Sequence, residues 1–459
     1  MIPVVTPEEM AAVDAAAPEP VEVLISRAGA AVAAAALDLL GGATGRRVVV
    51  VAGPGNNGND GRSAASLLER RGVRVTVHDA ATAPDVLEPA DLVVDAAFGT
   101  GFRGTYRFPD PDGAPVLAVD IPSGLDGLTG AASGAPAAAV ATVTFAAPKP
   151  GLLYGSGPAR CGEVRVADIG LDVSGARAHL VEDTDVLAWV PERSPDDHKW
   201  RHAVWVVAGS PGMTGAARLC AAAALRGGAG YVRLSVPGDA GPQEPVEAVH
   251  VPLPPSDWSD ALRPDAERFA VVAIGPGLGR AAGTAAAVRR AAADLDVPLV
   301  LDGDALFALG PDAPAVLAGR AAPTVLTPHD GEFERLTGAA PGPDRPGAAR
   351  GLASATGAVV LLKGPTTTVA APDGAVLVVR SGDARLATAG SGDVLTGLVA
   401  AHLAAGAEPL RAAAAAAHLH GLAARCGPPR GLVAGDLPDL VPVAWGRLLG
   451  SSSFPGGPA

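Results

Sequence analysis

The sequence predicts two α/β domains in which helices alternate with the strands of largely parallel sheets. Short runs of β-branched and aliphatic residues recur along the chain, separated by longer helix-like segments. At 459 residues the chain exceeds the usual ~100 to 200 residues of one domain. The pattern weakens around Leu171 to Asp185, and a second series of strands starts at Ala203. We therefore expect domains at residues 1–180 and 181–450, followed by a disordered tail at 451–459.

The first domain is predicted to be a Rossmann-like doubly wound sheet. Helix-like stretches fill residues 7–40, and the second of them, Val21 to Leu40, stops at a glycine pair that suits a helix C-terminus. A βαβ opening follows, with a glycine-rich loop at residues 53–61 and a helix at residues 62–71. The expected strands are Arg47 to Ala52, Val73 to His78, Leu92 to Ala96, Val116 to Val119, Ala141 to Phe145 and Glu163 to Val166.

The second domain repeats the alternation with a different ending. A predicted hairpin, Thr366 to Ala370 with Ala375 to Val379, turns at Pro372-Asp373-Gly374. It leads into Thr388-Ala-Gly-Ser-Gly-Asp393, after which the apolar run Val394 to Leu403 predicts a helix. The other expected strands are Ala203 to Ala208, Tyr231 to Val236, Val271 to Ile274, Leu299 to Asp302, Thr324 to Leu326 and Ala358 to Leu362.

Composition favours small-molecule chemistry. The apolar fraction of 48% supports sizeable cores, while aromatic residues make up only 3%. A net charge of -13 repels nucleic acid and anionic membranes, so we expect neither as a partner. Cys161, Cys220 and Cys426 show no metal-ligand spacing and indicate idle thiols. The N-terminus lacks a basic leader, and the apolar stretch Ala28 to Ala36 is short for a membrane span, so we expect a cytoplasmic protein.

The Gly390-Ser-Gly-Asp393 string predicts an anion site with a carboxylate beside it. Small residues let backbone N–H groups converge on an anion, and a helix N-terminus adds partial positive charge. Asp393 could then accept a proton from a hydroxyl, which suggests phosphoryl transfer onto an alcohol. The alternative is that the string is only a turn and helix cap.

The loop of the first domain is rich in polar side chains. Gly53, Gly55 and Gly58 fit the dinucleotide fingerprint G-x-G-x-x-G, and Asp79 near the end of the next strand could bind a ribose, as in an ordinary NAD-dependent dehydrogenase. Asparagines and an aspartate at residues 56–60 suit a hydroxylated ligand or a hard cation better, although loop capping is an alternative. Because the carboxyl ends of parallel strands line one crevice, we expect four polar residues to converge there: Asn57, Asp95, Asp120 and Ser123.

At these residues the first domain resembles the NAD(P)H-hydrate epimerase family. The strings GPGNNGNDG, VVDAAFGTG and AVDIPSGLDG occur in that order, with TVTFAAPKPGL and VADIGL behind them. The resemblance implies interconversion of the two hydrate epimers, with K⁺ on Asn57, Asp95 and Ser123. Asp120 is expected to have an acid/base role, although binding alone is the alternative. The implied substrate-binding residues are Asn56, Asn57, Gly58, Asn59, Asp60, Gly99, Thr100, Gly101, Phe102, Arg103, Gly104, Thr105 and Asp120. Asn59 departs from the family's usual glycine, and the stretch from Thr105 to Gly113 is shorter than expected.

The second domain resembles the ADP- or ATP-dependent NAD(P)H-hydrate dehydratases, relatives of the ribokinase-like sugar and vitamin kinases. The matching strings are HKW, AGSPGMTGAARL, ALRGGAGYV, IGPGLG, LDGDAL, LTPHDGEF, VVLLKGPTTTV and LATAGSGDVLTG. No G-x-x-x-x-G-K-[ST] string occurs, which disfavours a P-loop NTPase. The resemblance implies hydrate binding by Ala216, Gly277, His329 and Asp393, and nucleotide binding by Lys363, Gly364, Pro365, Thr366, Thr367 and Gly392. Departures are Phe307, Asp383, Arg385 and Ala389.

Structural alternatives stay open for these residues. Ala216 could be core packing and Gly277 a tight turn, His329 could cap a helix, and Lys363 could be a solvated charge. Asp302 and Asp304 could hold Mg²⁺ or cap a helix. His418 and His420, two residues apart on a helix, are not expected to form a metal pair.

Together the resemblances imply one enzyme that repairs hydrated NADH and NADPH. It would interconvert the R and S hydrates and then dehydrate the S hydrate, releasing phosphate and AMP or ADP. Expected partners are NADHX, NADPHX and ADP or ATP, with K⁺ and Mg²⁺ as cofactors, in a homo-oligomer. The rivals are a sugar or vitamin kinase fused to a dinucleotide-binding domain, and a binding scaffold whose first domain recognises a protein.

Overall fold

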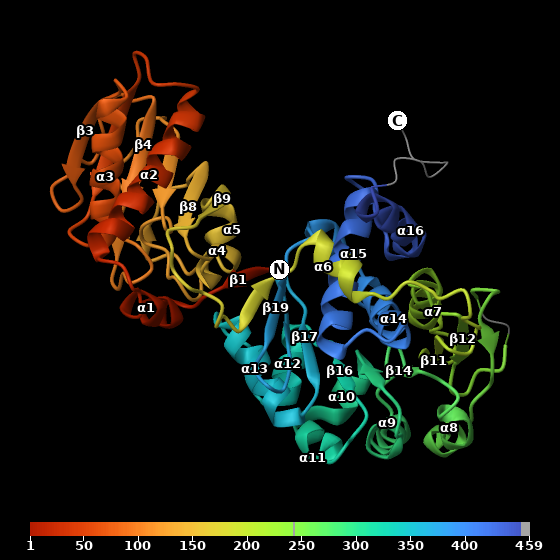
Figure 1. The fold of residues 1–459 in the computed structure, drawn as a ribbon. Coiled ribbons are helices and arrows are strands. Elements are labelled where there is room, and N and C mark those ends of the chain that lie inside the picture. Colours follow the sequence, from red (N-terminus) through yellow and green to blue (C-terminus); the bar gives the residue numbers. More distant parts are fainter. Residues whose placement is uncertain (242–243, 451–459) are drawn as a thin grey trace. The chain divides into compact units, whose positions relative to one another are not determined.

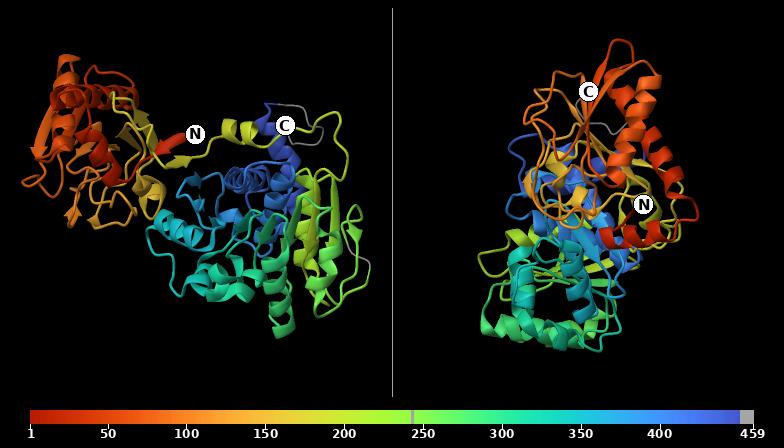
Figure 2. Two further views of the ribbon diagram at one scale, coloured as in Figure 1. Left: turned by 60° about the horizontal axis from the view of Figure 1, so that its bottom comes forward. Right: turned by 90° about the vertical axis from the view of Figure 1, so that its left-hand side faces the viewer.

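The computed structural model describes residues 1–241 and 244–450 and divides the chain into two compact units (Figures 1 and 2). The first unit comprises Ile2–Ala178, and the second comprises His179–Ala459 together with Met1. The tail at 451–459 that the sequence predicts to be disordered lies outside the described residues.

The first unit is a parallel sheet with helices packed against it. The strand order is β3-β2-β4-β6-β8-β9, with all neighbours parallel. Its helices are α1 (Pro7–Ala15), α2 (Val21–Leu40), α3 (Asn56–Arg70), α4 (Pro150–Leu153) and α5 (Gly157–Arg160). Its strands are β1 (Ile2–Val4), β2 (Arg47–Ala52), β3 (Arg74–Asp79), β4 (Leu92–Ala96), β5 (Tyr106–Arg107), β6 (Val116–Val119), β7 (Gly134–Ala135), β8 (Ala141–Phe145) and β9 (Glu163–Ala167).

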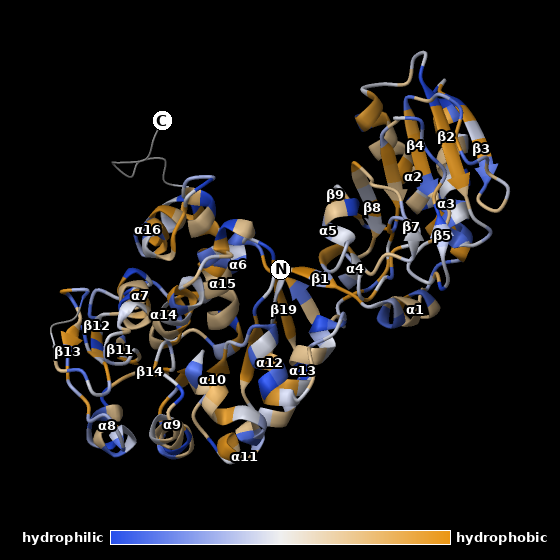
Figure 3. Cartoon of the chain, turned by 180° about the vertical axis from the view of Figure 1, so that it is seen from behind, coloured by the Kyte–Doolittle hydropathy of each residue, from blue (hydrophilic) through white to orange (hydrophobic). Residues whose placement is uncertain are grey.

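Hydrophobic patterning explains which strands lie inside this sheet. All residues of β4, β6 and β8 are buried, and β2 is buried from Val48 onward. The edge strand β3 is mostly exposed or half-buried, and Figure 3 shows β2 and β4 in the hydrophobic colour. Continuous aliphatic runs are typical of parallel strands covered on both faces, so the predicted doubly wound sheet is confirmed.

Helix α2 is long and apolar enough to cross a membrane by length and composition alone. The expectation based on Ala28 to Ala36 considered too short a stretch, because the helix that contains it is 20 residues long. Leu24, Ala28, Val32 and Ala36 nevertheless lie in the core of the first unit, packed with the residues of its sheet. Burying an apolar stripe in this way is what a core helix does.

The second unit also contains the predicted series of parallel strands. The order is β10-β19-β18-β17-β16-β15-β14-β11-β12-β13, in which β17, β18 and β19 are antiparallel neighbours and the pairs from β17 to β13 are parallel. The predicted hairpin is confirmed as β18 with β19. The strands are β10 (Ala178–Leu180), β11 (Ala203–Val207), β12 (Tyr231–Ser235), β13 (Val249–His250), β14 (Val271–Ile274), β15 (Leu299–Leu301), β16 (Thr324–Leu326), β17 (Val359–Leu362), β18 (Thr367–Ala370) and β19 (Val376–Val379).

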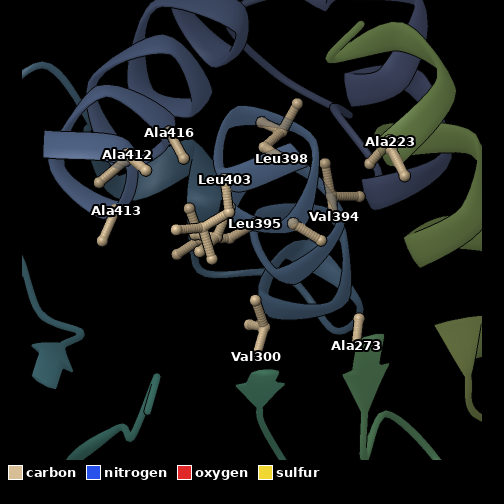
Figure 4. Close-up of a cluster of buried hydrophobic side chains, with 14 of the residues drawn as sticks. Ala223, Ala273, Val300, Val394, Leu395, Leu398, Leu403, Ala412, Ala413 and Ala416 are labelled. Atoms are coloured by element: carbon tan, nitrogen blue, oxygen red, sulfur yellow. The ribbon is translucent and has the colours of Figure 1, made fainter. Parts of the chain in front are cut away.

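Helices flank this sheet, and one of them crosses the core. They are α6 (Asp183–Trp189), α7 (Gly215–Arg226), α8 (Trp258–Ala266), α9 (Ala282–Asp294), α10 (Asp304–Leu309), α11 (Ala313–Leu317), α12 (Asp330–Thr337), α13 (Arg345–Thr356), α14 (Ser391–Ala404), α15 (Pro409–Cys426) and α16 (Leu437–Leu448). Every residue of α14 from Val394 to Ala404 is buried. Figure 4 shows its side chains between Ala273 and Val300 of the sheet, Ala223 of α7 and the alanines of α15. This packing fixes the start of α14 relative to the sheet.

Candidate active sites

A cavity of about 770 Å³ opens at the carboxyl ends of the strands in the first unit. Apolar side chains such as Met10, Leu24 and Ile169 line part of it. Polar groups come from the start of α3 and from the segments after β4 and β6. Concave sites with a few convergent polar groups are typical of small-molecule binding.

The glycine-rich stretch is helical earlier than predicted. Helix α3 starts at Asn56 and not at Arg62, so the asparagines form its first turn. Two positions in this helix require glycine because a Cβ atom would clash. At Gly58 the Cβ would lie 1.9 Å from the carbonyl oxygen of Gly53, and at Gly61 it would lie 2.4 Å from the Ala96 side chain. The helix therefore sits directly against the sheet, and its N-terminal N–H groups lie at the cavity.

Asp120 is held as an anion at the end of β6. Its Oδ1 accepts hydrogen bonds from Lys149 Nζ at 2.7 Å and Thr144 Oγ1 at 3.2 Å. Its Oδ2 accepts from Thr100 N at 3.1 Å and Thr100 Oγ1 at 3.2 Å. Burial would raise the pKa of Asp120, but the Lys149 ammonium and these hydrogen bonds lower it below its ordinary value. The backbone of Asp120 is left-handed at φ 66°, a strained conformation typical of functional positions.

Asp95 and Ser123 form a second buried pair. Ser123 donates to Asp95 through Oγ at 2.5 Å and through its backbone N–H at 2.8 Å. Burial raises the pKa of Asp95 to about 6, against the lowering effect of these hydrogen bonds. Across residues 1–241 and 244–450, no cation is paired with this carboxyl. A buried carboxylate without a cation is costly, so this site would gain from a bound positive ion.

Asn57, in the first turn of α3, lies beside Gly99 and Asp120. Its Nδ2 is buried without a partner. A Cβ added to Gly99 would lie 3.0 Å from Asp120 Oδ2 and 3.3 Å from Asn57 Oδ1, so both oxygens face the space that Gly99 leaves open. An orphaned amide and a glycine-lined gap are compatible with an oxygen-ligated ion or ligand at this place.

Part of the predicted substrate set lines the cavity. The lining residues from that set are Asn56, Asn57, Asp60, Gly99, Thr100, Gly101, Phe102 and Asp120. The cavity lining does not include Gly58, Asn59, Arg103, Gly104 and Thr105. Gly58 instead provides close packing, and the Arg103 guanidinium folds back on the carbonyl oxygens of Thr100 and Phe102 at 3.3 and 2.8 Å.

In the second unit, the predicted anion site is the N-terminus of α14. Gly390 caps the helix with φ 93°, and an added Cβ would lie 2.6 Å from the Leu219 side chain. A Cβ on Gly392 would lie 3.4 Å from Lys363 Nζ and 3.9 Å from Asp302 Oδ2. Gly390 therefore allows close packing against Leu219, whereas Gly392 leaves space beside the Lys363 ammonium at the helix N-terminus.

Lys363 is tied into a charged network and is not a solvated strand-end charge. Its Nζ lies 2.9 Å from Asp302 Oδ1 and 3.5 Å from Glu332 Oε2, and its side chain is 20% exposed. Thr396 of α14 donates to Asp302 Oδ2 at 2.7 Å. Burial would lower the pKa of Lys363, but Asp302 and Glu332 raise it above its ordinary value. The lysine therefore stays cationic beside the helix end.

The charges of Asp302, Glu332 and Lys363 also act on the carboxyl of Asp393. Burial raises the pKa of Asp393 to about 6; Asp302, Glu332 and Asp304 add to this, and Lys363 opposes it. A carboxyl that titrates slightly below neutrality can accept a proton and release it again. This arrangement favours a general base at the start of α14.

His329 caps helix α12, as the structural alternative required. Its Nδ1 accepts from the N–H groups of Gly331 at 3.0 Å and Glu332 at 3.2 Å, and Glu332 returns a bond to the His329 N–H. Its side chain is 59% exposed, so a role in binding stays a prediction. Gly277 has φ 65°, and an added Cβ would lie 3.1 Å from the Ala216 side chain, which places these two residues together.

Asp304 and Phe307 face a different set of partners. Asp304 accepts from the Gly279 N–H at 2.8 Å and from Arg280 Nε at 3.0 Å, and it opens helix α10. The Phe307 ring contacts the guanidinium groups of Arg280 and Arg335, 4.3 and 4.8 Å from the ring centroid. In the described part of the chain, no group of three or more His, Cys, Asp or Glu is suited to hold a metal.

Sequence reasoning missed four residues of these sites: Lys149, Thr144, Glu332 and Thr396. One signal was available, because the chain has only three lysines, Lys149, Lys199 and Lys363. Because the chain uses arginine almost everywhere else, its few lysines indicate positions where a compact ammonium group is needed.

Comparisons with known proteins match both units. A family model described as NAD(P)H-hydrate dehydratase matches residues 204–441, and one described as YjeF-related protein N-terminus matches residues 21–88 and 78–151. The bifunctional NAD(P)H-hydrate repair enzyme Nnr of Salinibacter ruber is 39% identical, covering 91% of each chain. The enzyme of the same name from Mycobacterium tuberculosis is 42% identical, covering 82% of each chain.

Solved structures match the second unit. The ADP/ATP-dependent NAD(P)H-hydrate dehydratase from Bacillus subtilis, co-crystallised with ATP and Mg²⁺, is 31% identical with a TM-score of 0.52. It covers 58% of this chain and 97% of its own. A ribokinase-like superfamily protein from Enterococcus faecalis, 22% identical with a TM-score of 0.52, covers 59% of this chain and 96% of its own. That second likeness shows the fold alone.

Proposed function

The chain belongs to the bifunctional NAD(P)H-hydrate repair enzymes, and from that premise we propose how its two units divide the work. The enzyme repairs hydrated NADH and NADPH by interconverting the R and S hydrates and by nucleotide-dependent dehydration of the S hydrate. We assign epimerisation to the domain at residues 1–180 and dehydration to the domain at residues 181–450. The observation that carries the second assignment is Asp393 at the start of α14, beside Lys363 and Asp302.

In the dehydratase domain, Asp393 takes the proton of the hydrate hydroxyl. The freed oxygen attacks the terminal phosphate of ADP or ATP, while the N–H groups at the start of α14 and the Lys363 ammonium stabilise the developing negative charge. A phosphate ester forms, and AMP or ADP leaves. The lone pair of the ring nitrogen then expels phosphate, a far better leaving group than hydroxide, and forms a carbon–nitrogen double bond. Loss of a proton from the neighbouring ring carbon moves the double bond back into the ring and restores NADH or NADPH. A kinase-like step thus serves a net dehydration.

The residues that contact each ligand are part of the same proposal. Ala216, Gly277, His329 and Asp393 bind the hydrate, supported by the closeness of Gly277 to Ala216. The nucleotide is bound by Lys363, Gly364, Pro365, Thr366, Thr367 and Gly392, supported by Gly392 facing Lys363. Mg²⁺ is commonly held by one or two carboxylates together with substrate phosphates, and the buried carboxylate of Asp302 near Lys363 fits that mode. The ion would neutralise phosphate charge.

In the epimerase domain, K⁺ would be held by Asn57, Asp95 and Ser123. The fit rests on the cation-free buried carboxyl of Asp95 and on the Asn57 oxygen that faces the gap beside Gly99. The ion supplies a fixed positive charge in the site. The two hydrogen bonds that Thr100 donates to Asp120 hold both residues in the wall against which the hydrate lies.

We place the enzyme in the cytoplasm, where NADH, NADPH and ATP are used. We also propose that it forms a homo-oligomer. Three free cysteines, two of them buried, are compatible with a reducing compartment. Sedimentation of the purified chain tests the oligomeric state.

The proposal is tested by incubating separated R and S hydrates with the enzyme and ADP or ATP. We expect the S hydrate to regain NADH absorbance directly and the R hydrate to do so at the pace of epimerisation. A sugar or vitamin kinase would instead release a stable phosphorylated product without restoring NADH. No recovery of NADH from the S hydrate would refute the dehydratase assignment.

A second prediction concerns K⁺. Replacing K⁺ by tetramethylammonium is expected to slow epimerisation at least about tenfold, because the buried carboxyl of Asp95 loses its counter-ion, while dehydration of the S hydrate is less affected. Epimerisation rates at equal ionic strength check this. Asp95→Asn, which keeps the shape of the side chain, should remove most of the K⁺ dependence. A K⁺ dependence unchanged in Asp95→Asn would contradict the proposed ligand set.

A further inference from the structure

One carboxyl in the first unit has no fixed partner. Asp60 lies in the second turn of α3, is 7% exposed and lines the cavity. Throughout residues 1–241 and 244–450, no hydrogen bond or ion pair reaches its side chain. Because Asp60 lines the cavity, a ligand bound there can approach its side chain. Without a partner, the charged form of a carboxyl in such a place is disfavoured, because an unpaired buried charge is costly.

The charged groups around Asp60 favour the same form. Asp14 of α1 and Asp120 after β6 both act on it with negative charge, and Glu19 also lines the cavity. Lys149 is bonded to Asp120, and Arg62 on the same helix turns to the carbonyl oxygen of Gly53 at 2.7 Å. Burial, followed by Asp120 and Asp14, raises the pKa of Asp60 to about 8. Asp60 therefore carries a proton at neutral pH.

Asp120 is poorly suited to move a proton. Its two oxygens accept four hydrogen bonds, from Lys149, from Thr144 and twice from Thr100. A carboxylate held by so many donors is a weak base, because protonation would displace one of them. When the environments of two carboxyls in one site shift their pKa values in opposite directions, one commonly transfers the proton while the other stays ionised.

We propose that Asp60 is the proton-transfer residue of epimerisation, while Asp120 remains an anion that orients the hydrate and Lys149 holds Asp120 in position. This rests on the proposed function of the first unit and names its acid. The acid/base role expected for Asp120 from sequence would then belong to Asp60.

The reaction balances with water alone. Asp60 gives its proton to the ring hydroxyl, the carbon–oxygen bond breaks, and a water molecule leaves as the lone pair of the neighbouring ring nitrogen forms a carbon–nitrogen double bond. Water then adds to the opposite face of that carbon, the electron pair returns to nitrogen, and the extra proton of the added water returns to the Asp60 carboxylate. The hydrate is inverted and Asp60 is protonated again.

The test compares Asp60→Asn with Asp120→Asn in the full chain, with the exposed Asp38→Asn as a matched control. We expect Asp60→Asn to lower kcat for epimerisation at least about 100-fold with KM changed only a few-fold, because the amide fills the same space but cannot donate an acidic proton. Asp120→Asn should mainly raise KM, and Asp38→Asn should match the wild type. An Asp60→Asn enzyme that keeps kcat and raises only KM would make Asp60 a binding residue and overturn the proposal.

Two measurements on the wild type do not depend on how the variants fold. The epimerisation rate should fall as the pH rises through about 8, where Asp60 loses its proton; a rate that stays constant there overturns the proposal. In heavy-oxygen water, each inversion should place one solvent oxygen in the hydrate, and retention of the original oxygen overturns it. If the wild type does not epimerise the hydrates at all, the assignment of the first unit fails, and with it the role of Asp60.

Discussion

Asp393→Asn is expected to reduce nucleotide-dependent dehydration by about 10² to 10⁴, the usual contribution of a general base. The amide can still accept a hydrogen bond but cannot take the hydroxyl proton. Because Asp393 opens the buried helix α14 and nearly matches asparagine in size, the fold of the second unit should be kept. Recovery of NADH from the S hydrate with saturating ADP or ATP measures the effect.

The carboxyl of Asp393 also sets the lower pH limit of dehydration by the wild type. The pKa of Asp393 is raised to about 6 by burial, then by Asp302 and the other nearby acids, against Lys363. The base is ionised above this pH, so kcat/KM for dehydration should fall about tenfold for each pH unit below about 6. Epimerisation in the Asp393→Asn enzyme, which uses residues of the first unit only, is the internal control. A dehydration rate within a few-fold of wild type in Asp393→Asn would contradict the assigned role.

Lys149→Met is expected to destabilise the first unit by about 3 to 5 kcal/mol, since it leaves Asp120 as a buried charge without its cation. Lys149 is 2% exposed, and its Nζ also donates to Thr144 Oγ1 and the carbonyl oxygen of Phe145. Epimerisation should be lost at a lower urea concentration than in the wild type.

The chain provides a convenient readout for this variant. All five tryptophans lie in the second unit, so tryptophan fluorescence follows that unit, while epimerisation activity follows the first. The fluorescence transition should be unchanged in Lys149→Met, and the exposed Lys199→Met should change neither. The double variant Lys149→Met with Asp120→Asn should recover part of the loss, because it no longer buries a lone charge. A double variant as unstable as the sum of the two single ones would argue against the ion pair as the cause.

The fold was largely predictable because aliphatic runs mark buried parallel strands, as in Leu92–Ala96 and Val271–Ile274, which appear with the predicted bounds. The start of α3 was not predictable by the same means. Asparagine and glycine have low helix propensity, and residues 56–61 are helical because glycines at 58 and 61 allow contact with the sheet. Tertiary packing here overrides local preference.

The sequence predicted which residue types lie at the strand ends of the two sites, but it did not predict which of these residues contact one another. The sequence places Asp120, Lys149 and Thr100 on separate segments, and only the fold shows that one carboxylate binds both other residues. The link from Lys363 through Asp302 to Thr396 likewise joins three elements. Such contacts depend on side-chain directions that one sequence does not specify. The roles of the individual site residues stay predictions.

Because α14 is buried, the stability of the second unit and the position of the reacting carboxyl depend on the same residues, two properties that many enzymes can adjust separately. The helix that presents Asp393 continues into the centre of the second unit as an unbroken buried segment from Val394 to Ala404 (Figure 4). A substitution that loosens this segment moves the reacting carboxyl as well, and one that adapts the helix start to a new substrate disturbs the core. Selection for heat resistance and selection for turnover therefore act on the same residues, which narrows the range of substitutions that this lineage can accept in α14.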